Sequence, residues 1–236
     1  LVPLLRPIDL TTPLAKAARD TILAWNRVLS AGSTGAAIYA LWERRLLSHT
    51  ANAVVPPSAR SLMRSVPLMR TVEWLTEADS MLGENPFIAR DDIVTSAFNE
   101  AIADLTQRFG ADMKHWVYGD AKLHHARIAH PLDRLVTDSL RAQLSPGPLA
   151  RGGYANTLNA TGNSDNQTAG ASFRIVVDLA DWESAIATNT PGQSGDPRSR
   201  HYQDLFALWA RGEYVPLPYS REAVDRRALE RVTIRP

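Results

Sequence analysis

The sequence contains no cysteine. Disulfide bridges, thiolate metal ligands and a cysteine nucleophile are therefore excluded. This absence does not select a compartment, because cytosolic and exported proteins both occur without cysteine. Apolar residues make up 44% of the chain. That share is ordinary for a packed globular protein, so the sequence predicts a folded chain rather than a disordered one.

The sequence also lacks an excess of charge of either sign, since 26 Lys and Arg residues stand against 25 Asp and Glu residues. A nucleic-acid-binding protein shows a basic face, so we expect no nucleic-acid partner. No apolar run reaches the roughly 18 residues that a membrane-spanning helix needs, so we expect no membrane partner. Leu1–Arg6 lacks the charged start and the apolar core of a signal peptide.

Helical spacing dominates the first 110 residues. Thr12 and Pro13 suit the cap and the first position of a helix, which we expect to run to Ser30. Residues 58–82 are predicted to be mostly helical, with a divide at Pro67. Between them a second helix is predicted, whose apolar face consists of Ile38, Leu41, Trp42 and Leu46.

A further helix is predicted to begin at Asp91–Asp92, because acidic residues stabilise the start of a helix through its dipole. Gly110 is predicted to end it, since glycine favours the backbone conformation that closes a helix. The apolar residues of its buried face are Val94, Ala97, Phe98, Ala101 and Leu105.

The pattern changes at about residue 111, where helical spacing gives way to short extended segments and a long polar loop. Ser172–Asp178 alternates as a strand does, and apolar residues on both sides predict that both faces are covered. Trp182–Asn189 is predicted to be a second strand, His201–Ala210 a helix, and Ser220 the cap of a last short helix. We therefore expect an α+β chain, with a mostly helical region 1–110 and a strand-containing region 111–236 that form one structural unit.

Three segments carry a resemblance to a known family. The first is Trp116–His125 with His130-Pro-Leu132, and the second is the strand Phe173–Asp178 with Trp182. The third is a glycine-rich motif that consists of Gly192, Gln193, Ser194 and Gly195, followed by His201, Tyr202 and Asp204. Together they resemble the C-terminal part of the β-subunit of penicillin amidases, a branch of the N-terminal-nucleophile hydrolases. The resemblance covers roughly residues 112–236.

The resemblance implies an αββα fold in the complete enzyme, to whose sheet this chain adds its last strands. It implies hydrolysis of an amide between an acyl group and an amine, with the first residue of the β-subunit, usually Ser, as nucleophile. This chain begins with Leu1, so we expect the nucleophile to lie outside it and assign no catalytic residue. The implied partners are the remainder of the β-subunit and the α-subunit, and a periplasmic or secreted location is favoured by the resemblance alone.

The motif itself favours a structural role. Gly192 and Gly195 permit a sharp turn or a close approach of backbone, and Gln193 and Ser194 can satisfy loop backbone groups. A Ser-His-Asp triad of Ser194, His201 and Asp204 is the alternative, and nothing in the sequence orients it.

The sequence suggests two further kinds of site. His124, His125 and His130 invite a metal site, but adjacent residues on an extended segment point to opposite faces, so we expect structural histidines and no metal. We expect no cofactor in this chain; many penicillin amidases bind calcium, and no residue here is assigned to it. Asn156 and Asn159, in the polar loop 152–167, are candidates to line the substrate cleft, with a solvated loop as the alternative.

The sequence thus predicts a C-terminal fragment of a penicillin amidase-like acylase acting on β-lactam or related N-acyl substrates. Two alternatives stay open. One is a non-catalytic binding or scaffold module with the same architecture, and the other is a fragment of an N-acyl homoserine lactone acylase.

Overall fold

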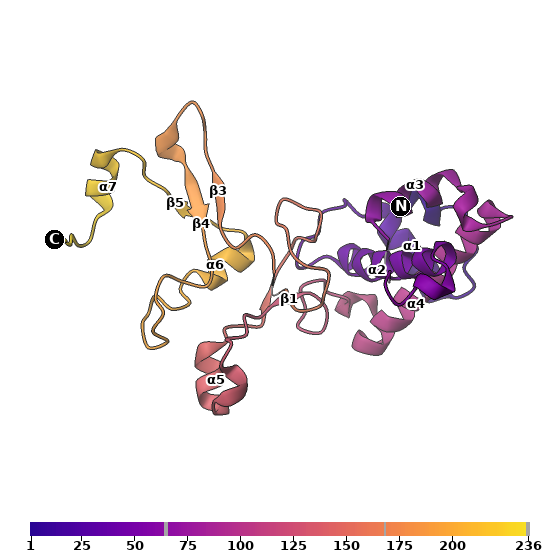
Figure 1. Ribbon diagram of the computed structural model, residues 1–236, viewed down its shortest axis with the longest axis horizontal. Helices are drawn as coiled ribbons and strands as arrows, with labels where there is room; N and C mark the ends of the chain where they lie inside the picture. The colour runs from indigo at the N-terminus through magenta and orange to yellow at the C-terminus, as the bar shows by residue number, and fades with distance from the viewer. Residues whose placement is uncertain (64–65, 168, 235–236) are drawn as a thin grey trace. The chain divides into compact units, whose positions relative to one another are not determined.

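The computed structural model describes residues 1–63, 66–167 and 169–234 (Figure 1). Its contacts divide the chain into two compact units, Leu1–Leu123 and His124–Pro236. The sequence placed the change of structure earlier, at about residue 111. The expectation that both regions form one structural unit stays a prediction.

The first unit is built from packed helices. Its core lies where α2 packs along α4 and α1 packs on α2. The α-helices are α1 (Pro13–Ala24), α2 (Thr34–Val54), α3 (Leu68–Glu77) and α4 (Pro86–Phe109). The short 3-10 turns are η1 (Val2–Leu5), η2 (Pro57–Ala59), η3 (Ser80–Leu82) and η4 (Met113–His115).

The buried faces predicted for α2 and α4 are confirmed, because every apolar residue named for them is buried. Trp42 of α2 meets Phe98 of α4 edge to face, with ring centroids 6.0 Å apart. The Trp42 indole N–H donates to the Val94 carbonyl oxygen at 3.4 Å. Burial of large side chains of this kind contributes about 1.5–3 kcal/mol each, and it holds the two helices together.

Helix α1 begins as predicted and ends earlier. Thr12 Oγ1 accepts a hydrogen bond from the Ala15 N–H at 3.1 Å, and Pro13 takes the first helical position. The predicted end at Ser30 is wrong, because the chain leaves the helix at Trp25. Two residues later Arg27 has a φ of 63°, which no right-handed helix accommodates.

Two other helix boundaries also differ from the predictions. Helix α4 starts at Pro86 rather than at Asp91–Asp92, since proline fits the first turn of a helix, whereas Gly110 (φ 83°) ends it as expected. Between η2 and Pro67 the predicted helix is wrong for the described residues, because α3 begins only after Pro67. Residues 64–65 lie outside the described residues.

The second unit joins short strands through long loops. Its strands are β1 (His125–Ala126), β2 (Leu149–Ala150), β3 (Arg174–Val176), β4 (Ile186–Thr188) and β5 (Val215–Pro216). Its helices are α5 (Asp138–Leu144), α6 (Phe206–Arg211) and α7 (Arg221–Arg227), with 3-10 turns η5 (Asp133–Leu135) and η6 (Trp182–Ser184). The mixture of helices and a few strands confirms the α+β description at this level.

The strands form two antiparallel sheets. One pairs β1 with β2, and the other has the order β3-β4-β5. In the larger sheet Ile175 lies opposite Ala187, which lies opposite Val215. The second predicted strand is shorter than expected, because Asp181 Oδ1 accepts the Glu183 N–H at 3.1 Å and turns its first residues into η6.

Strand β3 is not covered by the described residues of this chain, so the prediction of cover on both faces is wrong among them. Ile175 and Val176 point to opposite faces and are 49% and 53% exposed. The helix predicted from His201 is also wrong in its first half, where turns precede α6. The cap of α7 is confirmed: Ser220 Oγ accepts the Ala223 N–H at 3.2 Å.

Candidate functional site

Asn159 lies at the centre of a hydrogen-bonded cluster in the second unit. Its Oδ1 accepts hydrogen bonds from Arg151 Nη2 at 2.8 Å and from Arg174 Nη1 at 2.9 Å. Its Nδ2 donates to the Gly152 carbonyl oxygen at 3.2 Å. Both lone pairs of the amide oxygen are thereby used. A contact between Asn159 and substrate stays a prediction, and it would have to use the second N–H of Nδ2.

The positive charge of Arg151 is fully buried and is stabilised by aromatic and carbonyl groups. Its guanidinium carbon lies 3.9 Å from the centre of the Trp209 ring, in cation–π range. Its Nη2 also donates to the Ala160 carbonyl oxygen at 3.3 Å. Arg174 donates to the Trp209 carbonyl oxygen at 2.6 Å, and burial lowers the pKa of Arg174. These contacts join the polar loop to β3 and α6.

Asn156, the other asparagine predicted to line a cleft, is exposed on a tight turn. The Tyr154 N–H donates to Thr157 Oγ1 at 2.9 Å, and that hydroxyl donates back to the Tyr154 carbonyl oxygen at 2.9 Å. The turn buries Tyr154 and leaves Asn156 in solvent. The structure therefore gives the two asparagines different surroundings, and a substrate contact of Asn156 stays a prediction.

The glycine-rich motif folds back onto the backbone of His201. The N–H groups of Gln193 and Ser194 donate to the His201 carbonyl oxygen at 2.8 and 3.0 Å. A Cβ atom on Gly192 would lie 2.2 Å from this same oxygen, so only glycine fits there. Gly195, in contrast, has open space around it.

The end of the motif anchors the chain before α6. Tyr202 is buried, and its hydroxyl donates to the Leu144 carbonyl oxygen at 2.8 Å. The Leu205 N–H donates to the Pro191 carbonyl oxygen at 3.1 Å. Each of these contacts lies within the second unit, which supports a structural role for the motif.

The triad considered for Ser194 is not assembled. His201 Nδ1 lies 2.7 Å from Asp204 Oδ2, but His201 Nε2 accepts a hydrogen bond from Arg200 Nε at 3.0 Å. Ser194 Oγ accepts the Asp196 N–H at 3.1 Å instead of facing the imidazole. The nitrogen that a general base would use is therefore occupied by an arginine.

The three histidines considered for a metal site have separate surroundings. His124 is buried, His125 begins β1, and His130 Nδ1 accepts the Leu132 N–H at 3.1 Å. Across the described residues, no three His, Cys, Asp or Glu side chains gather in a way that would hold a metal ion. No described helix is long and apolar enough to cross a membrane.

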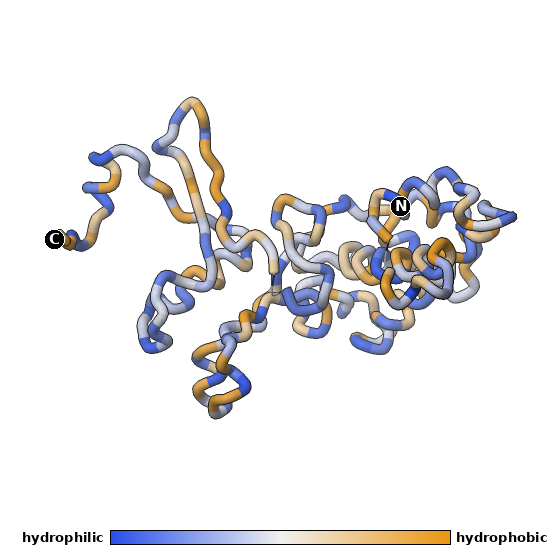
Figure 2. The backbone as a smooth tube through the Cα atoms, in the orientation of Figure 1, coloured by the Kyte–Doolittle hydropathy of each residue, from blue (hydrophilic) through white to orange (hydrophobic). Residues whose placement is uncertain are grey.

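The three-stranded sheet carries a bare apolar surface, which we call the β3–β5 apolar face. Trp182 and Tyr219 meet edge to face on it, with ring centroids 4.8 Å apart. Figure 2 shows the hydrophobic stretch that follows β3 toward the tip of its hairpin with β4. The face borders a cavity of about 290 Å³ that is lined by Ile175, Val177, Leu179, Trp182, Ala185, Leu217, Pro218 and Tyr219. An exposed apolar patch of this kind is typical of an interaction surface or a ligand-binding groove.

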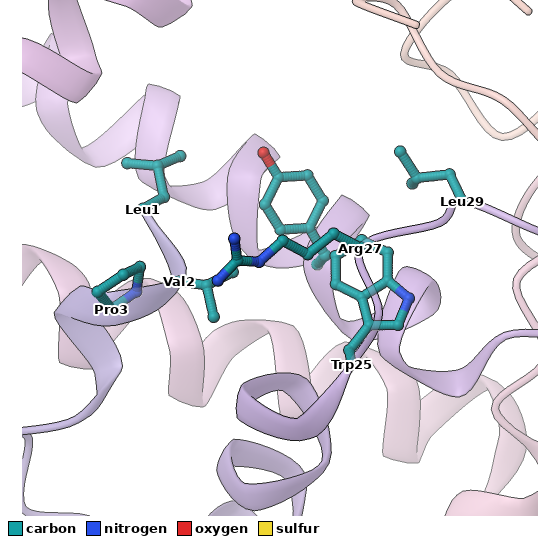
Figure 3. Close-up of a pocket in the computed structure, with 7 residues that line it drawn as sticks. Leu1, Val2, Pro3, Trp25, Arg27 and Leu29 are labelled. Carbon is teal, nitrogen blue, oxygen red and sulfur yellow. The ribbon is translucent and has the colours of Figure 1, made fainter.

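A second cavity of about 290 Å³ lies in the first unit (Figure 3). Trp25 and Tyr39 form one side, with ring centroids 5.4 Å apart. Arg27 extends across it toward Val2. The remaining lining residues are Leu1, Pro3 and Leu29.

The sequence interpretation missed Arg27 and Arg151. A left-handed backbone at an arginine has no signal in the sequence. Arg151 stands between Ala150 and two glycines, and a lone charge in such a segment is only a weak sign of burial.

The sequence model of the penicillin amidase family matches residues 1–226 of the chain. An acyl-homoserine lactone acylase (QuiP) of Pseudomonas aeruginosa is 26% identical over 237 residues, which cover 90% of this chain and 28% of that protein. A penicillin acylase 2 proenzyme of Pseudomonas sp. strain SE83 is 29% identical over 232 residues, which cover 93% of this chain and 28% of that protein. The chain thus spans little more than a quarter of the length of these relatives.

Among solved structures, a thermostable penicillin G acylase from Alcaligenes faecalis matches with a TM-score of 0.49 and 22% sequence identity. The match covers 100% of this chain and 46% of that one.

Proposed function

The chain belongs to the penicillin amidase family, and from this premise we propose that the complete protein hydrolyses an amide bond between an acyl group and an amine. The observation that carries the proposal is the family match over residues 1–226. The names of the relatives agree with it, since both are acylases.

In the proposed mechanism the nucleophile lies outside this chain. The hydroxyl of the first residue of the β-subunit attacks the carbonyl carbon, and its own α-amino group takes the proton. Collapse of the tetrahedral intermediate expels the amine, which receives that proton, and leaves an acyl ester. Water then cleaves the ester to release the carboxylic acid. An oxyanion hole outside this chain stabilises both intermediates.

This chain is proposed to be a structural part of that enzyme, and the β3–β5 apolar face supports this role. Leu179 and Trp182 are 84% and 48% exposed there. At about 25 cal/mol per Å², leaving such side chains in water forfeits roughly 1–2 kcal/mol each. The curated relatives are more than three times as long as this chain, so we propose that the remainder of the same precursor covers the face and completes an αββα fold.

Two substrate classes follow from the relatives. The name of one relative refers to penicillin and that of the other to acyl-homoserine lactones. We propose β-lactam or related N-acyl amides as one class and N-acyl homoserine lactones as the second. A panel that contains both, assayed on the complete protein, separates them by the ratio of their kcat/KM values.

The proposal is tested by comparing amide hydrolysis by the complete protein with hydrolysis by the 236-residue chain. We expect turnover by the complete protein and none by this chain alone. The control is a complete protein in which the first residue of the β-subunit is replaced by alanine, and it should be inactive. Turnover by the 236-residue chain of verified mass would contradict the structural role, and an inactive complete protein would contradict the amidase.

A further inference from the structure

A further cavity, of about 190 Å³, lies within the second unit. The described residues that line it are Ile128, Gln167, Ala169, Gly170, Ser172, Thr190, Pro191 and Trp209. None of these side chains is charged. A carboxylate or an ammonium group would therefore lose its hydration there without gaining a counter-charge, so the lining suits a neutral ligand.

Gln167 brings a hydrogen-bond acceptor to this cavity. The residue is 2% exposed, and its backbone N–H donates to the His125 carbonyl oxygen at 2.7 Å. Its Nε2 donates to the Ser164 carbonyl oxygen, which distinguishes the nitrogen of this amide from its oxygen. The oxygen, Oε1, has no hydrogen-bond partner among the described residues. A buried acceptor without a donor destabilises the fold, and a ligand that donates to it removes that cost.

Thr190 brings a hydroxyl group to the same cavity. Its Oγ1 is closed to solvent and has no hydrogen-bond partner within the described part of the chain. A hydroxyl both donates and accepts, and its proton rotates to suit a ligand. The terminal torsion of a glutamine is also soft, so a small rotation lets Gln167 Oε1 meet a donor placed in the cavity.

The remaining large side chains of the lining are apolar. The Trp209 indole N–H donates to the Ala171 carbonyl oxygen at 2.8 Å, so the Trp209 ring offers only carbon atoms to a ligand. Ile128 and Pro191 add aliphatic surface. In another protein, an apolar cavity of about 150 Å³ holds benzene. A cavity of about 190 Å³ is therefore large enough for an aromatic ring with one small substituent.

We propose that this cavity binds a small neutral hydroxy compound with a flat apolar body, such as a phenol. The ligand hydroxyl donates to Gln167 Oε1 and accepts from the Thr190 hydroxyl, and the ring lies against Trp209. A hydroxyl is the simplest group that supplies one donor and one acceptor, which these two side chains require. The site lies within the second unit and does not depend on the amidase proposal.

The test uses two probes of nearly equal shape, phenol and toluene, which differ in a hydroxyl and a methyl group. Binding to the complete protein is followed by the methyl NMR signal of Ile128, which reports on this cavity. We expect phenol to bind with a Kd on the order of 1 mM. Toluene should bind at least about tenfold more weakly, because it leaves Gln167 Oε1 without a donor. A purely apolar pocket would give the opposite order, since toluene is the more hydrophobic probe.

Two substitutions separate the hydrogen bonds from the shape of the cavity. Thr190→Val keeps the shape, removes the hydroxyl and should weaken phenol binding about fivefold. Gln167→Met removes Oε1 and should abolish the preference for phenol over toluene.

The matched control is Thr188→Val. Thr188 Oγ1 is also buried and has no hydrogen-bond partner among the described residues, but Thr188 lies outside the lining of the cavity. Its replacement should therefore leave both Kd values unchanged. The proposal would be overturned by the absence of a saturable shift of the Ile128 signal, by toluene binding as tightly as phenol, or by equal effects of Thr188→Val and Thr190→Val.

Discussion

Replacing Asn159 by alanine should destabilise the second unit, whereas the same change at Asn156 should not. Asn159 Oδ1 joins the guanidinium groups of Arg151 and Arg174 at 2.8 and 2.9 Å. Asn156 lies exposed on the same loop, three residues earlier. The two variants therefore remove the same side chain from one loop and differ only in the hydrogen bonds that each substitution breaks.

The magnitude follows from what each arginine keeps. A hydrogen bond to a charged group contributes about 1.5–3 kcal/mol when it is buried. Arg151 is fully buried and keeps its longer hydrogen bond to Ala160 and its contact with the Trp209 ring, so the loss there is about 2 kcal/mol. Arg174 is partly exposed and retains Trp209, so about 1 kcal/mol is lost there. The expected sum for Asn159→Ala is roughly 3 kcal/mol, against less than about 0.5 kcal/mol for Asn156→Ala.

Amide hydrogen exchange by mass spectrometry measures this difference within the second unit alone. A loss of roughly 3 kcal/mol corresponds to exchange about 150-fold faster in β3 and α6. Asn159→Asp keeps an acceptor between the two arginines and should retain most of the protection. Equal exchange in the Asn156→Ala and Asn159→Ala variants would refute the reasoning, as would equal loss of protection in the Asp and Ala variants of Asn159.

Three more outcomes are expected. Gly192→Ala should lower the free energy of unfolding by at least about 2 kcal/mol, because its Cβ would lie 2.2 Å from a carbonyl oxygen. Gly195→Ala has open space around the added Cβ and should change the free energy of unfolding by less than about 0.5 kcal/mol. Urea unfolding compares the two variants. Arg27→Gly should raise the melting temperature of the first unit, since relief of a left-handed backbone at a non-glycine residue gains about 1 kcal/mol, and a lower melting temperature would contradict the strain. Hydrogen bonds from Ser220 lower the pKa of Glu183. The stability that Glu183 contributes is therefore present above the ordinary glutamate pKa and is lost as the pH falls through the lowered pKa. The fall of stability at acid pH should be less steep in Glu183→Gln, and an unchanged fall would contradict this.

Local chemistry explains which parts of the fold could be predicted from the sequence. Thr12 and Ser220 cap helices as expected, because a cap needs only a side-chain oxygen near the first free N–H groups. The buried face of α4 was also predictable, since helical spacing alone defines it. The end of α1 was not predictable, because the chain turns to extended backbone at Trp25 (φ −66°, ψ 138°) without a glycine or proline to mark it.

The roles of the loop residues depend on contacts between distant segments. Asn159 meets Arg174, fifteen residues later, and the aromatic partner of Arg151 is Trp209 on α6. Neither pairing leaves a periodic pattern in the sequence. The exposure of Ile175 could not be predicted either, because an apolar strand looks the same whether its cover comes from this chain or from another segment.

The most direct test of the central claim maps the acyl group that the complete protein carries during turnover. A slowly hydrolysed acyl amide is added to the complete protein, the reaction is quenched with acid, and the acylated peptide is identified by mass spectrometry. We expect the acyl group on the first residue of the β-subunit, outside these 236 residues. An acyl group on Ser194, or on any other residue of this chain, would contradict the account.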